Sequence, residues 1–288
     1  MADSFDVIVI GGGPAGYPAA IRAGQNGLSV ACIDEWKNHD GSAAFGGTCL
    51  NAGCIPSKAL LESTELYHRA REEFALHGIQ VPGVSMDVAT MQKRKSGIVK
   101  KMTDGVMALL KGAGVTPLQG HGRLLPGKQV EFKSHQGEVR TLSAKQVVLA
   151  SGSAPIELKS APFDGKQIID SWGALELPAV PKRMGVIGAG VIGLELGSVW
   201  RRLGSEVVVL EALDSFLAIA DQQLAKEAAK HFKRLGMDIR TGAKVTGAVL
   251  KGPAVQPSTL PPTTVTSTSA TSTNLAALKL RRRAIAPS

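Results

Sequence analysis

The feature that most constrains the fold is a short apolar strand followed by a glycine-rich turn and a helix, which occurs twice in this chain. In the first copy the strand is the β-branched run 6–10, and the helix is expected at 19–23. The turn has the spacing GxGxxG, with Gly11, Gly13 and Gly16. In such a turn the first glycine permits the bend, the second lets the backbone approach a pyrophosphate, and the third allows close helix packing. The pattern predicts a Rossmann-like, dinucleotide-binding domain.

An acidic pair completes this first copy. The second strand is expected at 28–33, and it ends in Asp34-Glu35, about twenty residues beyond the turn, where a ribose-binding carboxylate belongs. Asp34 is the better aligned of the two acids, and the alternative for it is a solvated residue at a strand end. Cys32 lies inside this strand and is expected to be a buried, small apolar residue without chemistry.

The second copy begins with the strand 184–187 and continues through a helix around 195–200 and a strand at 206–210. Its turn glycines are Gly188, Gly190 and Gly193. Glu211 follows the last strand, where a carboxylate accepts hydrogen bonds from ribose hydroxyls and repels a 2′-phosphate. No arginine follows within the next several residues, so NAD is favoured over NADP. Two complete copies predict two dinucleotides, held by two domains.

The boundary between these domains is expected just after the buried strand 146–150, where the chain enters a proline-dotted crossover. We therefore predict an α/β fold with a first dinucleotide-binding domain at 1–152 and a second at 153–250. Helices are expected at 59–75 and 87–111, and short strands at 116–125 and 129–132.

Two cysteines lie between the two copies. Cys49 and Cys54 are separated by four residues, and Lys58 follows the second cysteine by four. If a helix starts at Leu50, Cys54 and Lys58 share one face, and Cys49 lies at or before the first turn, where the helix dipole favours a thiolate. The pair could cycle between dithiol and disulfide. The alternatives are two ordinary free thiols or, less favoured for want of further ligands, a zinc site, so no metal is predicted.

The run GGTCLNAGCIPSKALL at 46–61, followed by ELYH at 65–68, closely resembles the active-site helix of the dihydrolipoamide dehydrogenase family. These class I pyridine nucleotide-disulfide oxidoreductases are the FAD-dependent E3 components of 2-oxo acid dehydrogenase complexes. The resemblance covers about residues 5–250. It implies FAD on the first domain, NAD on the second, and dihydrolipoamide on a lipoyl domain as substrate. The family is homodimeric.

The resemblance also implies roles for individual residues. Cys49 would meet the substrate, Cys54 would contact the flavin, and Lys58 would approach the reactive edge of the flavin, where a cation stabilises the charge of the reduced form. Glu195 would be the ion-pair partner of Lys58, and Val245 an apolar contact to the adenine of NAD. The remaining flavin contacts would be Gly47, Thr48, Gly122, Ser151 and Gly152.

Two other functions stay open at this point. A relative of glutathione or mercuric reductase would share the disulfide chemistry, but those enzymes usually prefer NADP, against which Glu211 argues. A non-catalytic remnant that binds only a nucleotide or a partner subunit would retain the glycine turns without turnover.

Charge and hydropathy give little support to other classes of protein. The formal net charge is +9, but five of these charges come from 251–288, a segment without acids, which leaves about +4 for the first 250 residues. This is an ordinary surface, so nucleic-acid binding is not predicted. No apolar run is long enough to span a membrane, and the N-terminus carries acids where a secretory signal would carry basic residues. A cytoplasmic protein is expected.

The composition changes abruptly after Lys251. About half of the residues from 253 onward are serine, threonine or proline, and no aromatic residue occurs there. We predict that 251–288 is a disordered basic tail. The family would instead complete its FAD domain here and add an interface domain with a histidine–glutamate pair. We therefore expect this C-terminal interface domain to be missing, as in a truncated or frame-shifted copy with impaired activity.

Overall fold

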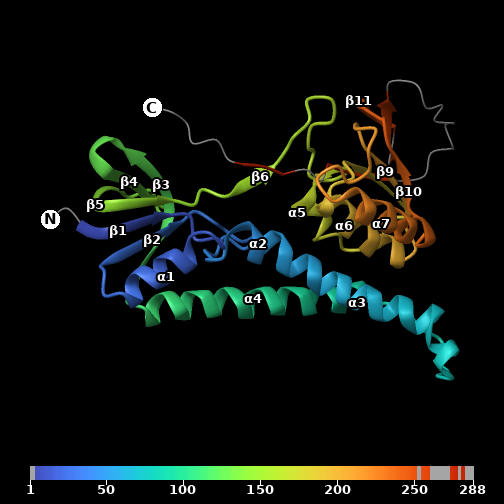
Figure 1. Ribbon diagram of the computed structural model, residues 1–288, viewed down its shortest axis with the longest axis horizontal. Helices are drawn as coiled ribbons and strands as arrows, with labels where there is room; N and C mark the ends of the chain where they lie inside the picture. Colours follow the sequence, from blue (N-terminus) through green and yellow to red (C-terminus); the bar gives the residue numbers. More distant parts are fainter. Residues whose placement is uncertain (1–3, 252–253, 260–272, 278–279, 283–288) are drawn as a thin grey trace. The chain divides into compact units, whose positions relative to one another are not determined.

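A computed structural model describes residues 4–251, 254–259, 273–277 and 280–282 of the chain (Figure 1). The chain forms two compact units. The first takes the described residues up to Pro56 together with 96–154, and the second takes 57–95 and the described residues from Pro155 to Arg281. The division after Ala154 falls two residues beyond the boundary predicted at 152. It also groups 57–95 with the second unit, whereas the sequence-based boundary placed them in the first.

The first unit is built on five strands that close into a barrel in the order β1-β2-β3-β4-β5. These strands are β1 (Ser4–Ile10), β2 (Val30–Asp34), β3 (Thr116–Leu125), β4 (Gln129–Ser134) and β5 (Val139–Leu149). β1 pairs in parallel with both β2 and β5, and β2 pairs in parallel with β3, while β4 is antiparallel to β3 and β5. Helix α1 (Tyr17–Gln25) packs on β1 and β2 (Figure 1).

The core of this unit follows from the alternation of side chains along β1. Ile8 and Ile10 pack with Phe132 of β4 and Leu142 of β5. Val9 packs in a separate cluster, which includes Phe45. Every residue of β2 is buried, as expected of a central parallel strand.

The second unit contains a parallel sheet with the order β10-β9-β8-β13-β7. Its strands are β7 (Ile168–Asp170), β8 (Arg183–Ile187), β9 (Glu206–Leu210), β10 (Asp238–Arg240) and β13 (Thr273–Ala277). The accompanying helices are α5 (Ser171–Ala174), α6 (Val191–Arg202) and α7 (Gln222–Arg234). Trp200 of α6 is fully buried. Its Nε1–H donates to the carbonyl oxygen of Ala174 at 3.0 Å, and this hydrogen bond links α5 to α6.

The remaining elements agree with the helices predicted after the cysteine pair. Helix α3 covers Cys54–Glu72 and α4 covers Val88–Gly112, close to the predicted ranges 59–75 and 87–111. The other elements are α2 (Gly47–Ala52), η1 (Phe74–His77), η2 (Pro126–Lys128), β6 (Ser153–Pro155), β11 (Val245–Lys251), β12 (Ala254–Thr259) and β14 (Leu280–Arg282). Among the described helices, none combines the length and apolar character needed to cross a bilayer.

Within the predicted tail, the structure differs from the expectation of disorder at three places. β12 pairs with β11 in an antiparallel hairpin, β13 lies between β8 and β7, and residues 280–282 form the strand β14. Strand pairing uses main-chain groups, so a segment without apolar periodicity can fill an open position in a sheet. The rest of the predicted tail, at 252–253, 260–272, 278–279 and 283–288, lies outside the described residues.

Candidate active site

The first glycine turn joins β1 to α1, and its three glycines have different surroundings. Gly11 has a φ of +108°, and an added Cβ would lie 1.9 Å from the carbonyl oxygen of Ala150. A Cβ on Gly16 would lie 1.7 Å from the carbonyl oxygen of Gly11. The closest atom to a Cβ on Gly13 is the Cα of Gly47, at 3.5 Å, an ordinary contact. Gly11 and Gly16 are thus required by the protein's own packing, whereas Gly13 is not.

The two acids at the end of β2 point to different neighbours. Asp34 is buried, with 8% of the residue exposed, and its carboxylate accepts a hydrogen bond from the Trp36 N–H at 3.0 Å. The carboxylate lies against the turn, because a Cβ on Gly12 would be 2.5 Å from Asp34 Oδ2. The Glu35 carboxylate instead contacts Nδ1 of His121 in β3 at 2.6 Å. Asp34 is thus the predicted carboxylate that the structure brings against the glycine turn.

Cys32 is fully buried in β2, as the sequence predicts. Burial, with a smaller contribution from the charge of Asp34, raises the pKa of the Cys32 thiol to about 12. The thiolate of this residue is therefore scarcely populated near neutral pH.

The cysteine stretch forms two helices rather than the single helix that would start at Leu50. α2 ends at Ala52, and α3 begins at Cys54, so Cys49 lies in the first turn of α2, a separate helix from the one that carries Cys54. The break is at Gly53, whose φ and ψ of −150° and −114° are not helical, and a Cβ there would lie 2.9 Å from the carbonyl oxygen of Thr48. Cys49 is half-buried and Cys54 is exposed. Cys54 and Lys58 are one turn apart in α3, as predicted.

The segment before α2 lies on the first glycine turn. Gly47 has a φ of +57°, and a Cβ on it would lie 2.7 Å from the Cα of Gly13. The Thr48 hydroxyl donates to the carbonyl oxygen of Ser153 at 3.4 Å, which brings the chain after β5 beside this segment.

Three further predicted flavin contacts lie on β3 and in the loop after β5. Ser151 and Gly152 are exposed in that loop, and Gly152 has a φ of +75°. Gly122 packs on β2, since its Cβ would lie 3.1 Å from Cδ1 of Ile33.

Lys58 and Glu195 form an ion pair, as the family resemblance implies. Lys58 Nζ lies 2.7 Å from Glu195 Oε1, and the lysine and glutamate side chains are 60% and 24% exposed. The hydroxyl of Ser57, a buried residue, donates to the other carboxylate oxygen at 3.0 Å. Two consecutive residues of α3 therefore hold both oxygens of Glu195. The sequence analysis missed Ser57, because no spacing rule connects it to a residue 138 positions away.

The second glycine turn joins β8 to α6. A Cβ on Gly193 would lie 2.3 Å from the carbonyl oxygen of Gly188, which has a φ of +101°. A Cβ on Gly190, the residue before α6, would meet no atom within 4 Å among the residues that the structure describes. Gly190 therefore leaves open space at the start of the helix, where backbone N–H groups favour an anion.

Glu211 follows β9 and faces this turn. Its Oε2 accepts from the Ala189 N–H at 2.8 Å and its Oε1 from the Leu213 N–H at 3.0 Å. Val245 is buried in a small core with Leu210 and Ala243, and Ile187, the residue before Gly188, packs against the same core.

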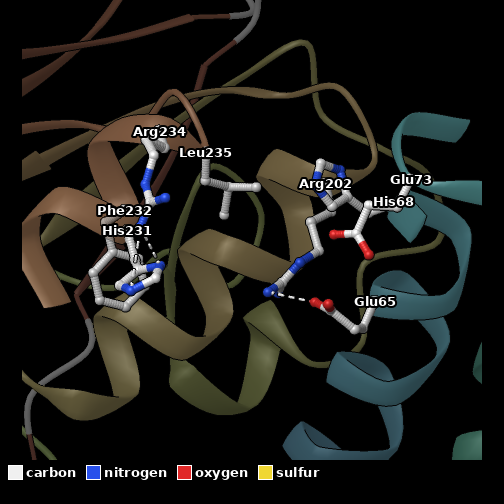
Figure 2. A pocket seen from close by; sticks show the side chains of 8 residues that line it. All are labelled: Glu65, His68, Glu73, Arg202, His231, Phe232, Arg234 and Leu235. Atoms are coloured by element: carbon white, nitrogen blue, oxygen red, sulfur yellow. Dashed lines mark hydrogen bonds and ion pairs between the residues drawn. The ribbon is translucent and has the colours of Figure 1, made fainter. Parts of the chain in front are cut away.

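A hollow of about 380 Å³ lies in the second unit (Figure 2). Its lining comes from α3 and the residue after it, from α6, and from the end of α7 and the residue after it. The lining residues are Glu65, His68, Glu73, Arg202, His231, Phe232, Arg234 and Leu235. Across it, an Arg202 Nη atom lies 2.8 Å from a Glu65 carboxylate oxygen. None of these residues was among the predicted site residues.

Comparison of the fold with solved structures defines the class of protein. LpdA from Mycobacterium tuberculosis matches with a TM-score of 0.78 and 25% identity, over 90% of this chain and 55% of that one. The flavoprotein disulfide reductase RclA from Escherichia coli has the same fold, with a TM-score of 0.75 at 22% identity. The family model for pyridine nucleotide-disulphide oxidoreductases matches residues 5–268. The chain belongs to this family, whose members use FAD and NAD.

Curated relatives within the family are more similar in sequence. The dihydrolipoyl dehydrogenase of Cupriavidus necator is 51% identical over 247 residues, which are 85% of this chain and 52% of that protein. Dihydrolipoyl dehydrogenase 3 of Pseudomonas putida is 49% identical over 244 residues, which are 84% of this chain and 51% of that protein. The chain spans about half the length of the curated relatives it matches.

Proposed function

We propose that this chain carries the flavin and NAD chemistry of a dihydrolipoyl dehydrogenase. Its substrate would be dihydrolipoamide on a lipoyl domain of a 2-oxo acid dehydrogenase complex, and NAD would accept the hydride. The observation that carries the proposal is the Lys58–Glu195 ion pair at 2.7 Å, four residues after Cys54, in a chain 51% identical to a dihydrolipoyl dehydrogenase.

The first unit has features that fit FAD. A Cβ on Gly13 would make only an ordinary contact with Gly47, and the Asp34 carboxylate lies against the same turn. The turn would hold the pyrophosphate through its N–H groups, and Asp34 would accept hydrogen bonds from the ribose. When bound, FAD supplies a two-electron carrier between a dithiol and a nicotinamide.

The cysteines would perform thiol–disulfide exchange. A substrate thiolate attacks Cys49 of the Cys49–Cys54 disulfide, forms a mixed disulfide, and releases the Cys54 thiolate. The second substrate thiol, after losing its proton, then displaces Cys49, which leaves a protein dithiol and an oxidised substrate. Lys58 provides a fixed positive charge one turn beyond Cys54, and Ser57 and Glu195 fix its direction.

The second unit has features that fit NAD. Gly190 leaves space for a pyrophosphate at the start of α6. A carboxylate has about four lone-pair sites, so Glu211 can accept from ribose hydroxyls while it keeps its two backbone partners. Its charge would repel the 2′-phosphate of NADP.

We also propose that steady turnover by this chain alone is slow. Release of a thiolate from the substrate needs a general base. Among the described histidines, His121 and His135 contact Glu35, and His231 contacts Arg234. A chain short of a general base would be slow in the half-reaction with dihydrolipoamide, and therefore in the full cycle, while substrate already present as thiolate would still reduce the disulfide.

The test is the visible absorbance of the purified protein before and after one equivalent of dihydrolipoamide. We expect a flavin spectrum that develops a long-wavelength charge-transfer band on partial reduction. Cys49→Ser and Cys54→Ser should each abolish reduction by the dithiol, while Cys32→Ala should behave as the wild type. A protein that binds no FAD after incubation with the cofactor would contradict the proposal and favour a non-catalytic remnant.

A further inference from the structure

Helices α3 and α6 carry two ion pairs of opposite polarity with the same spacing. In the first pair α3 supplies the cation and α6 the anion, Lys58 with Glu195 at 2.7 Å. In the second pair α3 supplies the anion and α6 the cation, Glu65 with Arg202 at 2.8 Å. The two positions are seven residues apart on each helix.

This spacing fixes the direction of packing. Seven residues are close to two helical turns, or about 10.5 Å along the axis, so both charged positions of each helix lie on one face. Because the residue numbers rise together, the two helices run parallel along this contact. Leu60 of α3 and Leu194 of α6 are buried in the same core cluster.

Hydrogen bonds along α6 also connect the second ion pair to the first. Arg202 Nη1 donates to the Ser198 hydroxyl at 3.2 Å, and that hydroxyl donates to the carbonyl oxygen of Glu195 at 2.7 Å. The Arg202 side chain is only 18% exposed, although it borders the hollow in Figure 2.

The charge pattern disfavours other registers of the two helices. A slip of two turns in one direction would oppose Lys58 to Arg202, and in the other direction Glu65 to Glu195. A slip of one turn would leave Glu195 and Arg202, both mostly buried, without their partners, which is costly. The observed register is the one that satisfies all four charges.

We propose that Glu65 and Arg202 are positioning residues that set the register of α3 on α6 and thereby hold Lys58 on Glu195. The consequence for flavin chemistry rests on the proposed function; the positioning itself does not. Neither residue needs to touch substrate or cofactor for this role.

The test measures the acylation rate of individual lysines by mass spectrometry on the full chain. Lys58 in its ion pair should react slowly, and Glu195→Gln should raise its rate by about two- to fivefold, the factor expected for a partly exposed ion pair. Glu65→Arg should raise the Lys58 rate by a similar factor without touching Lys58 or Glu195. The double variant Glu65→Arg/Arg202→Glu should return the rate toward that of the wild type.

Two other lysines serve as internal controls. Lys95 is 2% exposed, so its acylation rate reports whether the second unit stays folded. Lys145, paired with Asp6 in the first unit, gives a reference rate that corrects for differences in reagent concentration. General loosening would raise the Lys95 rate together with that of Lys58. If Glu65→Arg loosens the unit, Glu65→Gln replaces it, with the same expectation for Lys58 and no change at Lys95. The proposal is overturned if Lys58 keeps its rate in both variants, if it accelerates only together with Lys95, or if the charge swap fails to restore it.

The flavin midpoint potential of the FAD-loaded chain gives a second measurement. We expect Glu65→Arg to shift it in the same direction as Glu195→Gln, and the charge swap to reverse the shift. Failure to bind FAD would overturn the proposed function, while the lysine rates would still decide the positioning role.

Discussion

The backbone N–H of Ala189 donates to the Glu211 carboxylate at 2.8 Å, which joins the second glycine turn to the end of β9. The two residues are 22 positions apart, and the bond aims the carboxylate at the turn. Glu211, which is predicted to bind the ribose, is therefore held in place by the backbone of the glycine turn, which is predicted to bind the pyrophosphate.

A first prediction concerns the nicotinamide cofactor. Glu211→Ala should weaken NAD binding by about 10- to 100-fold, because hydrogen bonds to a charged acceptor contribute about 1.5–3 kcal/mol. It should also narrow the preference for NAD over NADP, since the repulsion of a 2′-phosphate is lost. Calorimetric titration with both nucleotides measures this, and an unchanged NAD affinity would show that Glu211 does not contact the cofactor.

A second prediction separates two glycines of the same turn. Gly193→Ala should lower the free energy of unfolding by about 1–3 kcal/mol, because its Cβ would lie 2.3 Å from a carbonyl oxygen. Gly190→Ala should leave stability nearly unchanged and weaken NAD binding instead, since the added methyl would occupy the space left for the ligand. Urea unfolding and nucleotide titration of both variants check this. Equal stability losses in the two variants would argue against a ligand role for Gly190.

A third prediction concerns thiol reactivity. Iodoacetamide at mildly alkaline pH should modify Cys49 and Cys54 of the reduced, folded protein but leave Cys32 intact, because burial raises the pKa of Cys32 to about 12. All three should react in urea. Peptide mapping gives the sites, and rapid labelling of Cys32 in the native protein would show that β2 opens to solvent.

A fourth prediction concerns the pH dependence of stability. Hydrogen bonds from Lys145 and from the Ser29 N–H and hydroxyl lower the pKa of Asp6 from 3.8 to about 2. A carboxyl with a depressed pKa stabilises the fold above its ordinary pKa, and this stabilisation is lost as the pH falls through the folded value. Wild type should exceed Asp6→Asn in stability at pH 7, and their urea midpoints should converge between pH 4 and pH 2. A difference as large at pH 2 as at pH 7 would assign the effect to packing rather than to charge.

Local patterns were sufficient to predict much of the fold. The GxGxxG spacings and the β-branched runs predicted both strand–turn–helix units. Close packing of the helix on the strand requires glycine at 16 and 193, and this requirement arises within each unit. The helices after the cysteine pair also followed from periodicity. The break at Gly53 did not, since its cause is a close approach to the carbonyl oxygen of Thr48 that no pattern reports.

The candidate site was predictable only in part. The pairing of Lys58 with Glu195 came from the family resemblance, while Ser57 and the Glu65–Arg202 pair were not anticipated. The equal spacing of opposite charges on two helices is a signal that could have suggested the second pair. The strands β12, β13 and β14 were not predicted, since the composition of the tail indicated disorder. Main-chain pairing depends on open positions in a sheet rather than on apolar periodicity.

The sequence by itself determined which segments form the two strand–turn–helix units and which residues are candidates for redox chemistry, since both depend on residue type and on spacing along a single element. Only the tertiary structure decided which carboxylate at the end of β2 lies against the glycine turn, which side chains hold Glu195, and how α3 is registered on α6. The contacts of Glu195 and the register of α3 on α6 join residues more than a hundred positions apart. The choice between Asp34 and Glu35 concerns two adjacent acids of the same residue class. The energies of these arrangements come from contacts between elements, which the order of residues along the chain does not encode locally.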